Sequence, residues 1–593
     1  MGENRIDPYQ IVGFLILIAC AFWVFYYAPQ PAENINYDNQ NKIESNDGKS
    51  VSELDGPLLQ KKDTDLIINE EIFTLENEDI ILKISNKGGR IIESILKKYF
   101  DQNNEPIKIN DNNQNIYIVS DQNPSSFDTS NLFFDNVLTS DSDGTKLKFT
   151  HYSSNQANVE LTYFLPKSGY LFDFKIQTGD LNYTDIRLKW DLESLRNSRS
   201  ATYENRYTYM NYKNEDDSVE DLSAYSDDNE NGSAKWISYS QHFFNSFIIF
   251  NDLKNNIDFN SINLDNEDNE TKYLKKFETK IPLVNQSNSQ INESFKFYIG
   301  PNDYYILNDS YDGISKSIWF GWGIFGWINE NIFFPLYYFL SSFFSAGIAI
   351  VIMVILTRLV MSPVQYKMYL GQAKMRILKP EISVVSEKYK DDPMKKNQET
   401  MKIYNQAGAN PLAGCLPALI QLPVFYALFC FFPVAFALRG ESFLWADDLS
   451  TYDVIAELPF YIPFYGDHVS LFPITAAVAM FFYTKMSGSQ QMQPSQPGMP
   501  NMKFIMYVIP FTLLIFFNNF ASGLSLYYTV SNILTIIIML TIKNFILDEK
   551  KILATIEEKK KQPSSENRFQ RRLRKMKEMM DEAEKKQKLK SKK

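Results

Sequence analysis

The chain has 593 residues, which is room for three or more domains that each bury a core. It holds 24 glycines and 25 prolines, and 44% of its residues are hydrophobic, so collagen-like and low-complexity classes are excluded. Three cysteines are too few for a disulfide framework, and a net charge of −11 argues against a nucleic-acid-binding protein. The mean hydropathy of −0.28 averages a very polar half and a very apolar one.

The first apolar segment follows the N-terminus directly. Residues 11–28 carry no charge, and at 1.5 Å per residue they can cross a hydrocarbon core of about 30 Å. We therefore expect residues 1–28 to form a cytoplasmic N-terminus and a first membrane anchor. The sequence Leu17-Ile18-Ala19-Cys20 fits a lipoprotein cleavage box, but the apolar run continues beyond Cys20, which favours an uncleaved anchor. Residues 29–65 are polar and read as a disordered tether.

Residues 66–305 show the pattern of short β-strands. Apolar side chains alternate with polar ones at Val159, Leu161 and Tyr163, and again after the turn signal at 166–169. This pattern predicts an exported β-sandwich. The three histidines, His151, His242 and His468, have no partners at metal-ligand or catalytic-triad spacing, so we expect no catalytic site and no metal.

The rest of the chain alternates apolar segments with charged loops. Residues 315–333 are rich in aromatic side chains and predict an amphipathic helix that lies along the membrane interface. The segments predicted after it are a second span at 334–361, a cytoplasmic helical hairpin at 362–410, a third span at 412–438, a periplasmic loop at 439–468, a fourth span at 469–486, a cytoplasmic loop at 487–503, a fifth span at 504–521, a sixth span at 523–543 and a basic cytoplasmic tail at 544–593.

The charges of the short loops give the orientation. Residues 362–402 carry nine Lys and Arg against five Asp and Glu, whereas residues 439–468 carry one against six. Positive loops stay inside, so the first of these loops is expected to be cytoplasmic and the second periplasmic. Both termini are then cytoplasmic and the β domain is periplasmic.

Arg358 is the one charge expected inside a span. It follows 27 uncharged residues and precedes Ser362-Pro363, where we expect the helix to end or kink. It either reaches the cytoplasmic headgroups or lies in a water-reached cavity. The other polar residues of the spans favour the cavity; they are Gln421, Asn518, Asn519, Thr529, Ser531, Asn532 and Thr535.

Two basic segments face the cytoplasm. In the hairpin, one stripe of apolar residues runs from Met368 to Tyr389, and Asp392-Pro393 predicts the start of a second helix. The two helices can simply pack on each other. In the tail, Arg568, Arg571 and their neighbours suit anionic lipid and ribosomal RNA equally well.

Four motifs in order over 330–545 resemble one family. They are Thr357-Arg358-Leu359-Val360-Met361-Ser362-Pro363, then Ala373 to Pro380, then Asn410 to Pro417 with Gln421-Leu422-Pro423, and Ser522 to Tyr528 with Ser531-Asn532. This set is similar to the YidC/Oxa/Alb superfamily of membrane protein insertases, and the β domain extends the likeness to its Gram-negative bacterial form. One position departs from the family pattern, because the chain has Val354 one turn before Arg358 and places its threonine at Thr357.

The resemblance implies a fold and a function. The fold is a polytopic α-helical membrane protein of six spans, five of them an insertase core, with a large exported all-β sandwich domain. The implied activity is the insertion and folding of new integral membrane proteins in the bacterial inner membrane, without nucleotide hydrolysis, enzyme chemistry or cofactor. The implied substrate groove consists of Arg358, Gln421, Asn519, Tyr528, Thr529 and Asn532, and the implied receiving hairpin of Lys374, Met375, Arg376 and Pro380.

The implied partners are nascent membrane proteins, the phospholipid bilayer and the Sec translocon (SecYEG and SecDF), with the ribosome as a further partner of the basic tail, and no DNA.

The implied mechanism uses a water-filled groove that reaches partway across the membrane. Such a groove would shorten the distance that a polar substrate loop must travel through hydrocarbon, where each charged residue costs about 2.5–3.5 kcal/mol. Arg358 would attract an acidic substrate segment. The alternative from another class is a transporter or channel, although internal repeats and broken helices are not seen in the sequence. A third alternative is an exported enzyme on a membrane tether.

Overall fold

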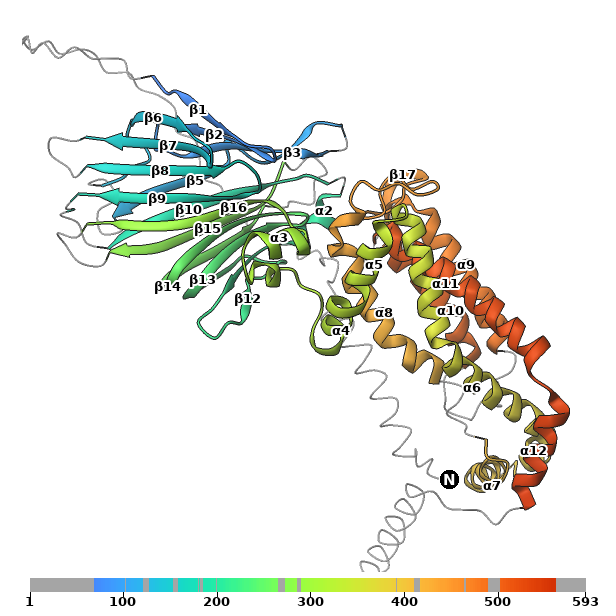
Figure 1. Ribbon diagram of the computed structural model, residues 1–593. Helices are drawn as coiled ribbons and strands as arrows, with labels where there is room; N and C mark the ends of the chain where they lie inside the picture. The colour runs from blue at the N-terminus through green and yellow to red at the C-terminus, as the bar shows by residue number, and fades with distance from the viewer. Residues whose placement is uncertain are drawn as a thin grey trace, which may run out of the picture. The chain divides into compact units, whose positions relative to one another are not determined.

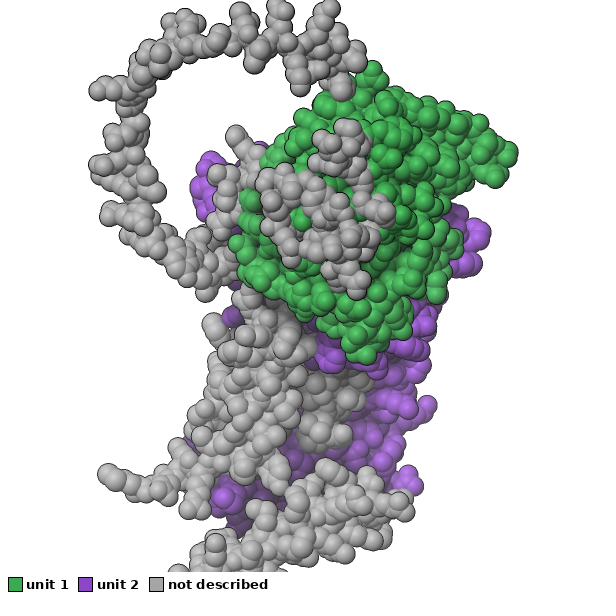
Figure 2. All heavy atoms as spheres, turned by 90° about the vertical axis from the view of Figure 1, so that its left-hand side faces the viewer, with its two compact units in different colours: residues 1–319 green, residues 320–593 purple. Residues whose placement is uncertain are grey.

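The structure is a computed structural model that describes residues 69–561, apart from 102, 121–126, 153–157, 180, 182–184, 199, 265–271, 285–289, 391, 410–415, 463–464 and 489–501. The predicted first anchor, the tether and the arginines of the tail lie outside the described residues. The chain divides into two compact units, Met1–Trp319 and Phe320–Lys593, which are coloured separately in Figure 2. Each unit is described by itself.

The first unit is built from antiparallel strands (Figure 1). One sheet has four strands in the order β1-β2-β3-β4; a twelve-stranded sheet follows the path β12-β11-β13-β14-β16-β9-β8-β7-β6, with β10, β15 and β5 joined beside it. The strands are β1 Ile72–Glu76, β2 Ile80–Ser85, β3 Ile91–Phe100, β4 Pro106–Asp111, β5 Gln114–Ser120, β6 Asp135–Ser140, β7 Gly144–His151, β8 Val159–Pro166, β9 Leu171–Thr178, β10 Ile186–Leu195, β11 Thr208–Lys213, β12 Val219–Asp221, β13 Asp228–Gln241, β14 Phe244–Asn263, β15 Tyr273–Val284 and β16 Asn292–Pro301. Three short helices accompany them: α2 Ala201–Asn205, α3 Tyr304–Ser310 and η1 Ile314–Ser317.

The predicted alternation in this unit is confirmed at β8 and β9. Val159, Leu161 and Tyr163 are buried while their neighbours along β8 are half-buried. The two strands form a hairpin whose turn includes Gly169 at φ +89°, a backbone conformation that costs glycine little. Period-two burial of large apolar side chains therefore gives this unit its core.

The second unit consists mainly of helices. Figure 1 shows them as a bundle, with a short two-stranded sheet at one end and two charged helices at the other. The elements are α4 Gly323–Ile328, the π-helix η2 Asn329–Phe333, α5 Phe334–Ser341, α6 Ala346–Lys388, α7 Pro393–Gln406, α8 Leu416–Val434, η4 Phe436–Leu438, β17 Ala456–Ile462, β18 Gly466–Val469, α9 Leu471–Gly488, α10 Met502–Phe517, α11 Ser522–Thr541, the π-helix η5 Ile542–Ile546 and α12 Glu549–Lys561.

The aromatic segment predicted as one helix over 315–333 is divided. It contains η1, an extended break, α4 and η2, and the helical path then continues into α5. The break includes Gly321 at φ +103°, which a helix cannot accommodate. A second break at 342–345 separates α5 from α6, so the long helix of the predicted second span begins at Ala346 rather than near 334.

The prediction that α6 ends or kinks at Pro363 is wrong in one respect, since the helix continues to Lys388. A proline cannot donate to the carbonyl four residues earlier, which here belongs to Leu359. The Ser362 hydroxyl donates to that carbonyl at 2.8 Å. The side chain next to the proline therefore supplies the missing hydrogen bond, and the span and the first hairpin helix are one continuous helix.

Two helices in the described part of the chain are long and apolar enough to cross a membrane, Ala346–Lys388 and Ser522–Ile546. Gln421–Val434 and Leu471–Met486 are shorter apolar helices. α10 has 16 residues and is joined to α11 by residues 518–521, close to the predicted joint at Ser522-Gly523. Among the described residues, the second unit thus has two helices of membrane-spanning length and two shorter apolar ones.

Candidate functional site

Arg358 lies between three helices. Its side chain starts on α6 and is buried, with 8% of the residue exposed. Nε donates to the Ser531 hydroxyl on α11 at 2.8 Å, and Nη2 donates to the same oxygen. Nη1 donates to the Gln421 side-chain carbonyl on α8 at 3.0 Å. The guanidinium is therefore held inside the unit.

The partners of Arg358 are neutral. Its hydrogen bonds go to a hydroxyl and an amide, and within the described ranges it forms no ion pair with a carboxylate. A buried charge without a counter-ion is costly, because an amide and a hydroxyl replace only part of its hydration. Such a charge inside an apolar bundle marks a functional site. An acidic group that approached Arg358 could form the ion pair that no carboxylate of the described residues forms with it.

Aromatic rings and two unpaired polar atoms lie near Arg358, Gln421 and Ser531. Tyr528 on α11 stacks on Phe517 with ring centroids 5.3 Å apart, and its ring lies 5.3 Å from that of Phe425 on α8. The Tyr528 hydroxyl and Gln421 Nε2 are buried and have no hydrogen-bond partner among the residues that the structure describes. These atoms could bind a polar peptide segment or water.

The other residues predicted for the groove lie elsewhere on these helices. The Thr529 hydroxyl lies 3.0 Å from that of Thr475 and joins α11 to α9. Asn519 lies in the turn between α10 and α11, beside Gly466. Asn532 follows Ser531 and is half-buried. Of the six predicted groove residues, the structure brings Arg358 and Gln421 into direct contact.

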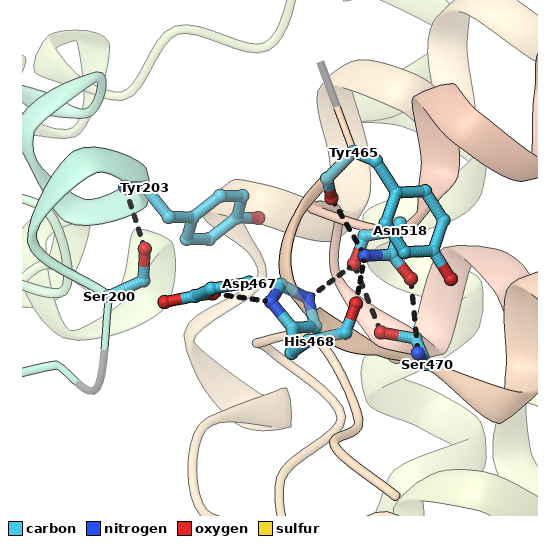
Figure 3. Close-up of polar contacts among 7 residues, drawn as sticks. All are labelled: Ser200, Tyr203, Tyr465, Asp467, His468, Ser470 and Asn518. Atoms are coloured by element: carbon cyan, nitrogen blue, oxygen red, sulfur yellow. Dashed lines mark hydrogen bonds and ion pairs between the residues drawn. The ribbon is translucent and has the colours of Figure 1, made fainter. Parts of the chain in front are cut away.

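At another part of the unit, a polar network joins the 439–470 loop to the end of α10 (Figure 3). The Asn518 amide donates to the carbonyls of Tyr465 at 2.8 Å and His468 at 2.9 Å, and its side-chain oxygen accepts from Ser470 N at 3.0 Å. His468 Nε2 lies 2.9 Å from the Asn518 carbonyl. This network fastens the loop to the turn between α10 and α11.

A carboxylate fixes the start of α9 in the same region. Asp453 is buried and its Oδ2 accepts from Leu471 N at 2.7 Å, from Phe472 N at 3.0 Å and from Trp445 Nε1 at 3.0 Å. The first two bonds satisfy free amides at the helix N-terminus.

The predicted hairpin is extended by a third helix. Asp392 caps α7 by accepting from Lys395 N at 3.0 Å, as the sequence predicted. The apolar stripe of α6 packs against α7 and also against α12, a part of the chain predicted only as basic tail. The buried members of this cluster are Ala373, Leu378, Tyr404, Ala407, Ala409, Ile552 and Ile556.

The four predicted receiving residues lie on this part of α6. Met375 packs against the cluster, and Arg376 forms an ion pair with Glu549 of α12. Burial, and then the positive charge of Lys559 on α12, lowers the pKa of Lys374. Pro380 is exposed within the helix. The hairpin surface is thus positively charged, with part of its charge neutralised by α12.

Ser531 is among the polar residues that favour a cavity at Arg358, but it is not one of the six residues predicted for the groove. A signal was available, because Tyr527, Ser531, Thr535 and Met539 follow one another at four-residue steps and are all buried on one face of α11. Val354, the position where the resemblance implies a threonine, is fully buried. Thr357 does not replace it, since its hydroxyl donates to the Met353 carbonyl of its own helix at 2.8 Å.

Comparison with known proteins covers nearly the whole described chain. Residues 73–335 match the family model of the YidC periplasmic domain, and residues 336–550 match that of the 60Kd inner membrane protein. The membrane protein insertase YidC of Parabacteroides distasonis is 35% identical over 537 residues, which cover 86% of this chain and 83% of that protein. The YidC of Bacteroides fragilis strain ATCC 25285 is 30% identical over 600 residues, 95% of each chain.

Among solved structures, a putative mutarotase (YeaD) from Salmonella typhimurium covers 39% of this chain at 9% identity and a TM-score of 0.25, too low for any inference.

The two matched regions define the class: an inner membrane protein with a β-rich periplasmic domain and a helical membrane unit. More particularly, the chain belongs to the YidC family of membrane protein insertases.

Proposed function

We propose that this protein inserts newly made integral membrane proteins into the bacterial inner membrane and assists their folding. The family assignment supports this function, and the observation that carries the mechanism is the buried Arg358 of α6 with its neutral partners on α8 and α11. The protein works without nucleotide hydrolysis, because burial of the substrate's apolar segment in lipid supplies the driving force.

The substrate path runs along the Arg358 cluster. A hydrophilic groove, open to the cytoplasm and to lipid, receives the polar segment that must cross. Arg358 attracts acidic residues in that segment, an interaction of a few kcal/mol at an effective dielectric near 20. Gln421 and Tyr528 present polar atoms to the same segment. The apolar part of the substrate then moves sideways into the bilayer.

The topology we propose has six spans, with both termini in the cytoplasm and the β domain in the periplasm. The hairpin of α6 and α7, with Lys374, Arg376 and Pro380, receives the substrate at the cytoplasmic side. Asn519, Thr529 and Asn532 belong to the walls of the path. The Sec translocon is a partner for some substrates, and the basic tail binds the ribosome or anionic lipid.

Reconstitution into liposomes tests this function. A small single-span substrate with an acidic translocated segment is expected to integrate without nucleotide. Arg358→Ala should reduce its integration strongly, while a substrate with a neutral segment is affected less. Arg358→Lys should keep part of the activity if charge matters more than the guanidinium fork. Lys485→Ala, which removes an exposed charge from α9, is the matched control.

Equal integration of the acidic substrate by wild type and Arg358→Ala would show that the buried charge does not contribute to insertion. Passage of solutes without substrate integration would instead support a transporter or channel.

A further inference from the structure

The loop between α8 and α9 contains an exposed apolar hairpin. β17 and β18 form an isolated two-stranded sheet with the pairs Ala456↔Val469, Glu457↔His468 and Ile462↔Gly466, and the register shifts between Glu457 and Ile462. Phe460 is 63% exposed and Tyr461 is 68% exposed on β17, and Ile462 is exposed as well. Between Glu457 and Asp467 the sequence has no charged residue.

Such a hairpin is poorly suited to water. A lone two-stranded hairpin is marginally stable in water, and a contiguous exposed apolar patch marks an interaction surface. The strand also leaves one edge unpaired in the described part of the chain. Something must therefore cover the apolar side chains of β17.

The hairpin lies level with the ends of the membrane helices. Its turn is fixed at Tyr465, whose carbonyl accepts from the amide of Asn518, the residue directly after α10 (Figure 3). Gly466 packs on Asn519, since a Cβ at Gly466 would come within 2.8 Å of the Asn519 side-chain oxygen. At the base, β18 ends two residues before α9 begins. Both the turn and the base of the hairpin are thus held at the helix ends, so the hairpin does not project freely from the unit.

The surrounding loop has the character of an interfacial anchor. Trp445 is partly exposed, donates its Nε1–H to Asp453 at 3.0 Å and packs its ring 4.4 Å from that of Phe472, near the start of α9. Tryptophan and tyrosine, whose rings carry one polar group on an apolar body, are typical of the membrane–water interface. Exposed apolar side chains continue along α9 at Val478, Phe481 and Phe482. The apolar surface of the loop therefore continues the surface that faces the hydrocarbon core.

We propose that the β17–β18 hairpin is an interfacial anchor, with Phe460 and Tyr461 in contact with phospholipid in the leaflet next to it. The lipid covers the exposed face of β17 and holds the ends of α9 and α10 at a fixed depth. This inference rests on the membrane placement of the helical unit and does not require insertase activity.

Photocrosslinking of the full chain in vesicles tests the proposal. p-Benzoylphenylalanine replaces Phe460, the protein is reconstituted in phosphatidylethanolamine and phosphatidylglycerol, and phospholipid adducts are measured by mass spectrometry after irradiation. The matched control carries the same amino acid at Tyr225, an exposed aromatic residue of the β-rich unit. We expect at least about tenfold more lipid adduct at 460 than at 225.

Equal adduct yields at the two positions, or none at 460, would overturn the proposal. So would a dominant crosslink from 460 to another protein, which would show that a protein rather than lipid covers this face of β17. Integration of a single-span substrate is measured in the same vesicles, so loss of insertase activity is read separately from loss of lipid contact.

Discussion

The Ser531 hydroxyl on α11 accepts two N–H groups of Arg358 on α6, Nε at 2.8 Å and Nη2. One small side chain thus determines where the guanidinium lies, and Gln421 on α8 holds its other side. Since the charge has no carboxylate partner in the described part of the molecule, its position depends on these two neutral groups.

Ser531→Ala is expected to leave two N–H groups of a buried guanidinium without their acceptor. The penalty for such groups is about 1–3 kcal/mol, and we expect a lower thermal stability together with weaker integration of the acidic substrate. Thermal unfolding in detergent and integration in liposomes measure the two effects. Ser525→Ala is the control, because the Ser525 hydroxyl is buried but makes no hydrogen bond to a described residue. Equal effects of the two substitutions would contradict a positioning role for Ser531.

Asn518→Ala is expected to loosen the loop between α8 and α9. Asn518 makes three side-chain hydrogen bonds to backbone atoms of this loop. Its amide donates to the carbonyls of Tyr465 and His468, and its side-chain oxygen accepts from Ser470 N. Each lost bond that leaves a buried group unpaired costs about 1–3 kcal/mol, so the loop should unfold locally. Hydrogen exchange of residues 465–472 should then be faster. Asn532→Ala on α11 serves as the control, and unchanged exchange in Asn518→Ala would show that the network is not needed to hold the loop.

Much of the β-rich unit could be predicted from the sequence, because strands with one buried face carry their register in the alternation of side chains. Val159, Leu161 and Tyr163 are an example. The continuity of α6 could not be predicted from Pro363 alone. The Ser362 hydroxyl bonds the carbonyl that Pro363 leaves free, and the helix runs through Pro380 as well.

The partners of Arg358 were the harder part of the site. The sequence identified the buried charge and Gln421, but it could not say which hydroxyl of α11 faces α6, since this depends on the rotation of one helix against another. In the tail the basic residues dominate the sequence pattern, so they do not predict that Ile552 and Ile556 lie in the core of the hairpin. The β17–β18 hairpin was read as loop, because its apolar run lacks the alternation of a half-buried strand.

The β-rich unit is expected to lose stability in acid partly through Asp79. This buried carboxyl forms an ion pair with Lys98 at 2.5 Å and accepts from Gly169 N at 2.6 Å. Burial alone would raise its pKa, but the bonds from Lys98 and Gly169 hold the pKa of Asp79 below its ordinary value. Because the folded pKa is the lower one, the stabilisation is fully present above the unfolded pKa of about 3.9 and is lost as the pH falls through the folded pKa.

Asp79→Asn removes this pH-dependent contribution. The variant should be less stable than wild type at pH 7, and the difference should shrink below about pH 4. The unfolding transition of the β-rich unit, followed by calorimetry of the full chain from neutral to acid pH, measures it. Asp143→Asn, at an exposed turn, is the control. A stability difference that stays constant with pH would mean that the Asp79 charge does not contribute.

Ile556 is expected to hold α12 on the hairpin. It is 1% exposed, and it packs in the cluster formed by α6, α7 and α12. Truncation of a buried isoleucine to alanine costs about 2–5 kcal/mol. The ion pairs of α12 with α6, Arg376–Glu549 and Lys560–Glu381, are exposed and contribute less than about 1 kcal/mol each, so they should not keep the helix docked.

Ile556→Ala should therefore speed hydrogen exchange throughout α12 and along the facing part of α6. Leu553→Ala, at a position 45% exposed on the same helix, should leave the exchange of both helices nearly unchanged. If the two variants exchanged alike, or if breaking the ion pairs had the larger effect, α12 would be held by charge rather than by its apolar face.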